Sequence, residues 1–117
     1  MNIDRIVTRY HQAWTSGDME AARLCLDDDL DFQGSIDTFR RADDFIAALT
    51  LFRKMIARVT VICSFYSDSG AALLYDCETM SPAGVIRTAE FFTVAGGKMK
   101  TIRLVFDATE LRKLMAR

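Results

Sequence analysis

The chain has 117 residues, of which 50% are hydrophobic and 26% are charged, and its formal net charge at pH 7 is -1. This composition excludes intrinsic disorder, and the length predicts one domain that spans residues 1–117. Basic residues form only short, scattered pairs, so we expect no nucleic-acid partner.

Two helices are predicted at the N-terminus. Gly17 is expected to end the first helix, and Asp18 to cap the second. Asp27–Asp29 are expected to end the second helix, because carboxylates at a helix C-terminus oppose the helix dipole. The apolar stripe of the first helix is Ile3, Ile6, Val7, Tyr10, Ala13 and Trp14, and that of the second is Met19, Ala22 and Leu26.

A short strand and a third helix are predicted next. Residues 30–36 alternate loosely between apolar and polar side chains, which indicates a short strand. Asp43 and Asp44 favour the first turn of a helix, where carboxylates interact well with the dipole. The expected buried face of this helix is Phe45, Leu49, Phe52 and Ile56.

Four long strands follow, at residues 59–66, 71–80, 85–94 and 98–106, separated by turns rich in Gly, Ser, Asp and Pro. Residues 107–110 resemble a capping box that starts a short terminal helix. Long strands twist, so the sheet should curl around the helices. The predicted fold class is therefore α+β, a cone-shaped, curved antiparallel sheet packed on N-terminal helices.

Neither face of the strand at residues 85–94 is uniformly polar. Both faces of the sheet are therefore expected to be covered. The helices cover one face, and a second copy of the chain is the economical candidate for the other. We thus expect a homodimer through the outer face that carries Arg87, Ala89 and Phe91.

The length of the last hairpin loop decides which residue lies opposite Glu90. A two-residue Gly96-Gly97 loop would place Arg103 there as an ion-pair partner, whereas a three-residue loop from Ala95 would place Ile102 there. The second register is preferred, because it builds one apolar wall with Glu90 inside it. That wall consists of Phe92, Val94, Ile102, Leu104 and Phe106, and Leu73, Tyr75 and Cys77 share one face of the preceding strand.

Cys25, Cys63 and Cys77 lack the spacing of a zinc site or a disulfide framework, so reduced thiols in a cytoplasmic protein are expected. The N-terminus has no secretory pattern and no apolar run is long enough to span a membrane. A single histidine and the absence of nucleotide-binding glycine motifs lead us to expect no metal and no cofactor.

Several short motifs carry a resemblance through their order and spacing along the chain. They are Arg9-Tyr10, Trp14-Thr15-Ser16-Gly17-Asp18, Leu26-Asp27-Asp28-Asp29, Ala89-Glu90-Phe91-Phe92, Gly97-Lys98-Met99 and Arg103-Leu104-Val105-Phe106-Asp107. With them the chain resembles the nuclear-transport-factor-2-like (cystatin-like) superfamily, in particular its SnoaL-like and ketosteroid-isomerase-like members. The resemblance implies a cone with a deep pocket and, in many members, a dimer through the outer sheet face.

The resemblance also implies roles for single residues. Tyr10 matches the oxyanion-hole tyrosine of ketosteroid isomerase, and Glu90 matches its protonated carboxyl, although with a longer side chain. The position of the general base holds Gly34, so the isomerase mechanism of that family is not expected. The epoxide-hydrolase arrangement also fails, because Leu104 occupies the position of one of its acids.

Tyr10 and Glu90 are therefore the candidate catalytic residues, for cofactor-free acid–base chemistry on a small hydrophobic, oxygen-bearing molecule. His11 is expected at a flanking surface or dimer contact. A non-catalytic dimeric binding or assembly module is the alternative, indicated by a filled cone with Glu90 paired to Arg103 rather than an open pocket of several hundred cubic ångströms. The predicted ligand-binding residues are Trp14, Phe32, Phe45, Leu49, Phe52, Tyr75, Cys77, Thr88, Phe92, Leu104 and Phe106.

Overall fold

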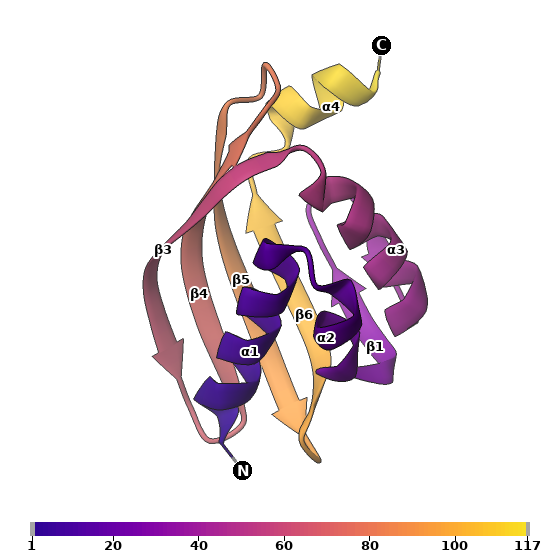
Figure 1. Ribbon diagram of the computed structural model, residues 1–117, viewed down its shortest axis with the longest axis vertical. Coiled ribbons are helices and arrows are strands. Elements are labelled where there is room, and N and C mark those ends of the chain that lie inside the picture. The colour runs from indigo at the N-terminus through magenta and orange to yellow at the C-terminus, as the bar shows by residue number, and fades with distance from the viewer. Residues whose placement is uncertain (1, 117) are drawn as a thin grey trace.

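A computed structural model describes residues 2–116 as helices packed in the concave face of one strongly curved sheet (Figure 1). The six strands lie in the order β2-β1-β6-β5-β4-β3. The helix α1 lies along the concave face, and α4 lies at one end of the sheet. The elements are α1 (Ile3–Ser16), α2 (Met19–Leu24), β1 (Leu26–Gln33), β2 (Thr38–Phe39), α3 (Ala42–Arg53), β3 (Ile56–Tyr66), β4 (Gly70–Thr79), β5 (Val85–Ala95), β6 (Lys98–Phe106) and α4 (Thr109–Met115).

The strands β3 to β6 form the predicted antiparallel meander, but β1 pairs with β6 in parallel. The short strand β2, which was not predicted, pairs with β1 at the edge of the sheet. The parallel pair joins segments that are some seventy residues apart, such as Phe32 and Ile102. The sheet is therefore mostly rather than wholly antiparallel. Local periodicity carries no signal for a pairing of this kind, so the sequence did not predict it.

The boundary between α1 and α2 follows the prediction. Gly17 has a φ of 87°, a left-handed conformation that glycine adopts at little cost, and it ends α1. The side chain of Asp18 then accepts a hydrogen bond of 3.1 Å from the backbone N–H of Ala21 and caps α2. These two residues turn the chain back toward the sheet.

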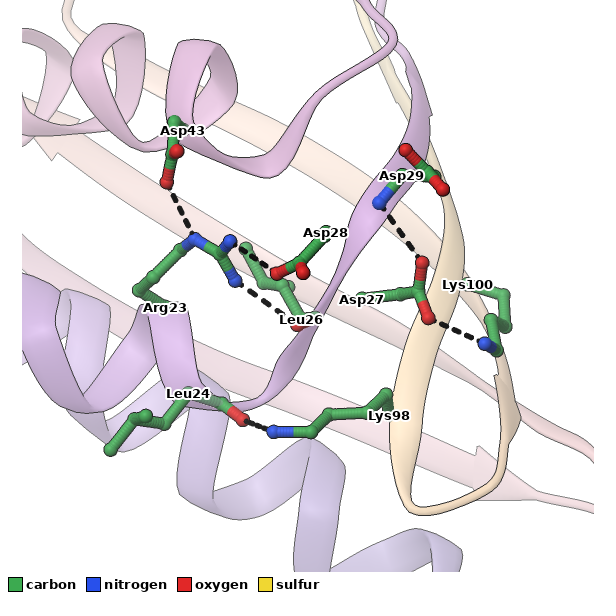
Figure 2. Close-up of polar contacts among 9 residues, drawn as sticks. All are labelled: Arg23, Leu24, Leu26, Asp27, Asp28, Asp29, Asp43, Lys98 and Lys100. Atoms are coloured by element: carbon green, nitrogen blue, oxygen red, sulfur yellow. Dashed lines mark hydrogen bonds and ion pairs between the residues drawn. The ribbon is translucent and has the colours of Figure 1, made fainter.

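The acidic segment Asp27–Asp29 was expected to end the second helix, and this prediction is wrong. The segment lies within β1 (Figure 2). Arg23 donates hydrogen bonds to the carboxylates of both Asp28 and Asp43, and Lys100 of β6 pairs with Asp27. The neighbouring cations relieve the charge repulsion that three adjacent carboxylates would otherwise suffer. Solvent screens such exposed pairs, so they add little to stability.

The hairpin between β5 and β6 combines features of both predicted registers. Gly96 and Gly97 have φ values of 59° and 76° and form a two-residue loop, and Ala95 pairs with Lys98. A bulge between Thr93 and Val94 then shifts the register by one residue.

As a result Glu90 faces Leu104, so both predicted partners, Ile102 and Arg103, were wrong. The bulge nevertheless returns Ile102, Leu104 and Phe106 to the inner face, opposite Phe92, Glu90 and Thr88 respectively. The predicted apolar wall therefore exists, displaced by two residues along β5.

Two further boundaries differ from the prediction. Ile56 begins β3 instead of completing the buried face of α3. Asp107 accepts hydrogen bonds from the backbone N–H and the hydroxyl of Thr109, so the predicted capping box with Glu110 does not form. Among residues 2–116, no helix has the length and apolar character needed to cross a membrane.

Candidate functional site

A mostly apolar cavity of about 130 Å³ lies between the concave face of the sheet and the helices. Both predicted catalytic residues and all predicted ligand-binding residues except Phe92 line it. From α1, β1 and α3 these are Tyr10, Trp14, Phe32, Phe45, Leu49 and Phe52. From the sheet they are Tyr75, Cys77, Thr88, Glu90, Leu104 and Phe106.

Phe92 was predicted to touch the ligand but is not part of the cavity lining. It is buried behind Tyr10, and the two rings meet edge to face with centroids 5.9 Å apart. Phe92 lies on the predicted inner face of β5, but α1 covers it. It therefore supports the tyrosine rather than the cavity.

The segment between β1 and β2 supplies cavity-lining residues that the sequence did not indicate. It consists of Gly34, Ser35, Ile36 and Asp37, and Leu111 of α4, Ala48 of α3 and Ile86 of β5 also line the cavity. The Ser35 hydroxyl accepts a hydrogen bond of 3.0 Å from the Phe106 N–H, and the backbone carbonyl of Ser35 accepts one from the side chain of Arg112 in α4. Irregular loop residues follow no period, so no sequence pattern marks them.

Glu90 projects from β5 into this cavity and is 2% exposed. The hydroxyl of Tyr75 donates a hydrogen bond of 2.8 Å to its Oε1. Burial raises the pKa of Glu90 from 4.5 to about 7, and the hydrogen bond from Tyr75 opposes that rise only in part. At neutral pH both protonation states of this carboxyl are therefore populated.

Arg103 is not the partner of Glu90. Its guanidinium donates hydrogen bonds to the carbonyl and the carboxylate of Asp31 in β1. It lies opposite Phe91, on the outer face of the sheet. No cation neutralises Glu90 from that side, which agrees with its raised pKa.

Tyr10 is 1% exposed, and its pKa is raised well above 10, first by burial and then by the charge of Glu90. Burial and the same carboxyl also raise the pKa of Tyr75. Both phenols therefore keep their protons at physiological pH. Each can donate a hydrogen bond, and that of Tyr75 is already directed at Glu90.

His11 was expected at a surface or dimer contact, but it is buried, with 6% exposure. Its ring packs edge-on against Tyr75 and Trp14, with centroid separations of 4.7 and 5.3 Å. Burial lowers the pKa of His11 to about 4, so the imidazole is neutral at pH 7. The curved sheet wraps around α1, which buries more of the helix than a flat sheet would.

Two other positions restrict the available chemistry. Burial raises the pKa of the Cys77 thiol to about 12, which keeps it protonated and a poor nucleophile. Gly34 lies at the base position of the resemblance, and a Cβ there would be 2.9 Å from Cε1 of Phe32, so a side chain would require the Phe32 ring to move. Within residues 2–116, no group of three or more His, Cys, Asp or Glu side chains could hold a metal.

Comparison with known proteins places this geometry in a family. The model of the SnoaL-like domain matches residues 7–102, which is most of the chain. The chain belongs to the SnoaL-like family. Its curved sheet and N-terminal helices are those of the nuclear-transport-factor-2-like, or cystatin-like, fold, as the resemblance predicted. A search of the curated proteins found no match.

Solved structures agree with this assignment. A protein from Kribbella flavida DSM 17836 is 27% identical, with a TM-score of 0.88 over 96% of this chain and 92% of its own. An M. tuberculosis epoxide hydrolase of the LEH-like type is 17% identical, with a TM-score of 0.74 over 96% and 91%. A putative polyketide cyclase from Sinorhizobium meliloti is 14% identical, with a TM-score of 0.77 over 86% and 93%. At these low identities the last two show the shared fold alone.

Proposed function

We propose that this SnoaL-like protein binds a small, apolar, oxygen-bearing molecule in the cavity and that Glu90 exchanges a proton with it. The observation that carries the proposal is the position of Glu90, a buried carboxyl in an apolar cavity with a pKa of about 7. Carboxyls with strongly perturbed pKa values in a concave site are typical of acid–base function.

The dimensions of the cavity limit the ligand. A cavity of about 150 Å³ lined by aliphatic and aromatic side chains is known to hold benzene. The cavity here, about 130 Å³, is therefore suited to a single small ring. The cavity is smaller than the several hundred cubic ångströms expected for a catalytic pocket, which favours the non-catalytic module. Glu90, however, is bonded to Tyr75 and not paired with Arg103, which favours the catalytic pocket.

The arrangement supports proton transfer beside a carbonyl group. Deprotonated Glu90 would take a proton from the carbon next to the carbonyl. The electron pair of that C–H bond would form a C=C bond, and the π pair of the C=O bond would move onto the oxygen. The Tyr10 hydroxyl would donate a hydrogen bond to this oxygen as its charge develops. Return of a proton from Glu90 to carbon would complete an isomerisation or an exchange. Because Gly34 offers no base, Glu90 has both proton-transfer roles.

Hydrogen–deuterium exchange tests this chemistry without knowledge of the natural substrate. Cyclopentanone is a neutral, single-ring ketone, and its α-protons exchange with D₂O through the same proton transfer. We expect the protein to accelerate the exchange, with a rate that rises as Glu90 loses its proton near pH 7. NMR spectroscopy of the ketone measures the rate.

Glu90→Gln should abolish the acceleration while cyclopentanone still binds, since the amide is nearly the same size as the carboxyl. Glu78→Gln, which removes an exposed carboxylate on the same sheet, is the matched control and should leave the rate unchanged. If cyclopentanone binds but wild type and Glu90→Gln exchange it equally slowly, the protein is the non-catalytic binding module instead.

We further propose that the protein is a homodimer through the outer face of its sheet. The strand register places a continuous apolar patch there, consisting of Cys63, Phe65, Ala72, Leu74, Ala89, Phe91 and Val105. The exposed fractions of Phe65, Phe91 and Val105 are 67%, 47% and 56%. Contiguous exposed apolar surface of this kind favours association.

Phe91→Glu tests this interface. The new carboxylate would face Arg103 across the hairpin, so the monomer should fold. Burying that charge between two subunits should weaken the dimer about a hundredfold or more. Light scattering at micromolar concentration measures the mass, and Leu51→Glu, at an exposed leucine of α3, should leave it dimeric. A monomeric wild type would contradict the proposal.

A further inference from the structure

The two carboxyl oxygens of Glu90 have different surroundings. Oε1 accepts the hydrogen bond of 2.8 Å from the hydroxyl of Tyr75. Oε2 receives no hydrogen bond from residues 2–116, and it is not one of the fully buried polar atoms that lack a partner. Because Glu90 is only 2% exposed and lines the cavity, the accessible surface of Oε2 lies in the cavity. A ligand can therefore meet Oε2, whereas Oε1 is already engaged.

The side chain that engages Oε1 is held in place by its neighbours. Tyr75 lies in β4 opposite Thr88 of β5, so it reaches Glu90 as a diagonal neighbour across the two strands. Tyr75 is 3% exposed, and the ring of His11 packs edge-on against it with centroids 4.7 Å apart. The ring of Trp14 lies 6.3 Å away on the same side chain. A ring packed in this way has little freedom to turn, so its hydroxyl keeps its direction.

The other groups around the cavity do not replace this hydrogen bond. The remaining titratable groups of the lining are the Tyr10 hydroxyl of α1, the Cys77 thiol of β4 and the Asp37 carboxyl of the segment after β1. Burial raises the pKa of both Tyr10 and Cys77, so they stay uncharged, and Asp37 bears a like charge. The side chains of α3 in the lining are apolar, and β6 presents Leu104 opposite Glu90. Among residues 2–116, the Tyr75 hydroxyl is thus the group that stabilises an ionised Glu90, and it lowers the pKa that burial raises.

We infer that Tyr75 is a positioning residue whose hydroxyl holds Glu90 by Oε1 and leaves Oε2 to exchange the proton with the ligand. This inference rests on the proposed function, in which Glu90 has both proton-transfer roles. A carboxyl held at one oxygen keeps one orientation toward the cavity, which proton transfer to a bound molecule requires. A hydrogen bond to an ionised carboxyl is also stronger than one to a neutral carboxyl, so Tyr75 favours the basic form.

Tyr75→Phe keeps the ring and removes the hydroxyl. Its ionised Glu90 loses the stabilising hydrogen bond, so Glu90 should bind a proton about tenfold more tightly than in wild type. A ¹³C NMR titration of the Glu90 carboxyl, without ligand, measures this affinity. Tyr66→Phe, at an exposed tyrosine of β3, is the matched control and should leave the titration unchanged. In wild type the Tyr75 Cζ resonance should change with the same midpoint as the Glu90 carboxyl, a measurement that needs no variant.

The exchange of the α-protons of cyclopentanone separates this role from a structural one. At pH 7 about half of Glu90 is ionised in wild type, against about a tenth in Tyr75→Phe, so the rate should fall about fivefold or more. At pH 9 Glu90 is mostly ionised in both proteins, and a loss of about threefold should remain, because the carboxyl is no longer held in one orientation. The affinity for cyclopentanone should stay within about twofold, since the cavity keeps its shape.

The outcomes distinguish this inference from the proposed function. An unchanged Glu90 titration in Tyr75→Phe, or equal exchange rates of the two proteins at pH 9, would overturn the inference and leave the proposed function standing. A Tyr75 Cζ resonance in wild type that does not respond to the ionisation of Glu90 would do the same. If wild type does not accelerate the exchange at all, the proposed function fails, and the role of Tyr75 fails with it.

Discussion

Replacing Glu90 by glutamine is expected to change the free energy of unfolding, relative to wild type, more favourably at high pH than at low pH. The folded-state pKa of Glu90 is about 7, against 4.5 for an exposed glutamate. Between these values the unfolded chain releases the proton and the folded chain retains it, so wild type loses stability as pH rises from 4.5 through 7. The full loss is about 3 kcal/mol, and the glutamine variant does not suffer it.

Urea unfolding of both proteins at pH 4.5 and pH 8.5 measures this effect. A constant difference is expected from the exchange of O for N, but Tyr75 can still donate its hydrogen bond to the amide oxygen. The informative quantity is therefore the change in the difference between the two pH values. Glu78→Gln is the control, because the pKa of Glu78 is lowered by Arg58, so any effect of its removal has the opposite sign. Parallel behaviour of wild type and Glu90→Gln at both pH values would show that Glu90 is not desolvated.

The sequence predicted the meander well, because its signals are local. Runs of β-branched and aromatic residues lie between turns, and β6 matches its predicted range of residues 98–106. By contrast, the strand assignment of Asp27–Asp29 depends on parallel pairing with β6 and on cations brought by Arg23 and Lys100. Those partners come from other elements, so a rule for helix ends gave the wrong answer there.

The site was predicted only as far as strand alternation and the family resemblance reach. Alternation placed Glu90 and Leu104 on the inner face, although one bulge changed which of them meet. The hydrogen bond from Tyr75 to Glu90 joins diagonal neighbours, since Tyr75 lies opposite Thr88, and it depends on the register between β4 and β5. The segment at residues 34–37 follows no period, and its place beside the cavity is set by contacts with β6 and α4.

His11→Phe is expected to stabilise the protein in acid. The pKa of His11 is about 4 in the folded state, against 6.5 in the unfolded chain. As pH falls from 6.5 toward 4, the unfolded chain takes up a proton that the folded chain does not, so wild type loses up to about 3 kcal/mol. Phenylalanine keeps the edge-on contacts with Tyr75 and Trp14, carries no titratable group and removes the unpartnered Nε2.

His11 and Glu90 therefore act in opposite directions over nearly the same pH range, about 4 to 7. In wild type their effects should largely cancel, which leaves stability almost flat between pH 4.5 and 6.5. Each single variant exposes the slope of the other group: with falling pH, His11→Phe should gain stability and Glu90→Gln should lose it. The double variant should be flat again, and because both side chains contact Tyr75, its departure from additivity measures their coupling. Urea unfolding of the four proteins across this range measures these slopes. If the free energies of unfolding of His11→Phe and wild type change in parallel with pH, the lowered pKa of His11 is refuted.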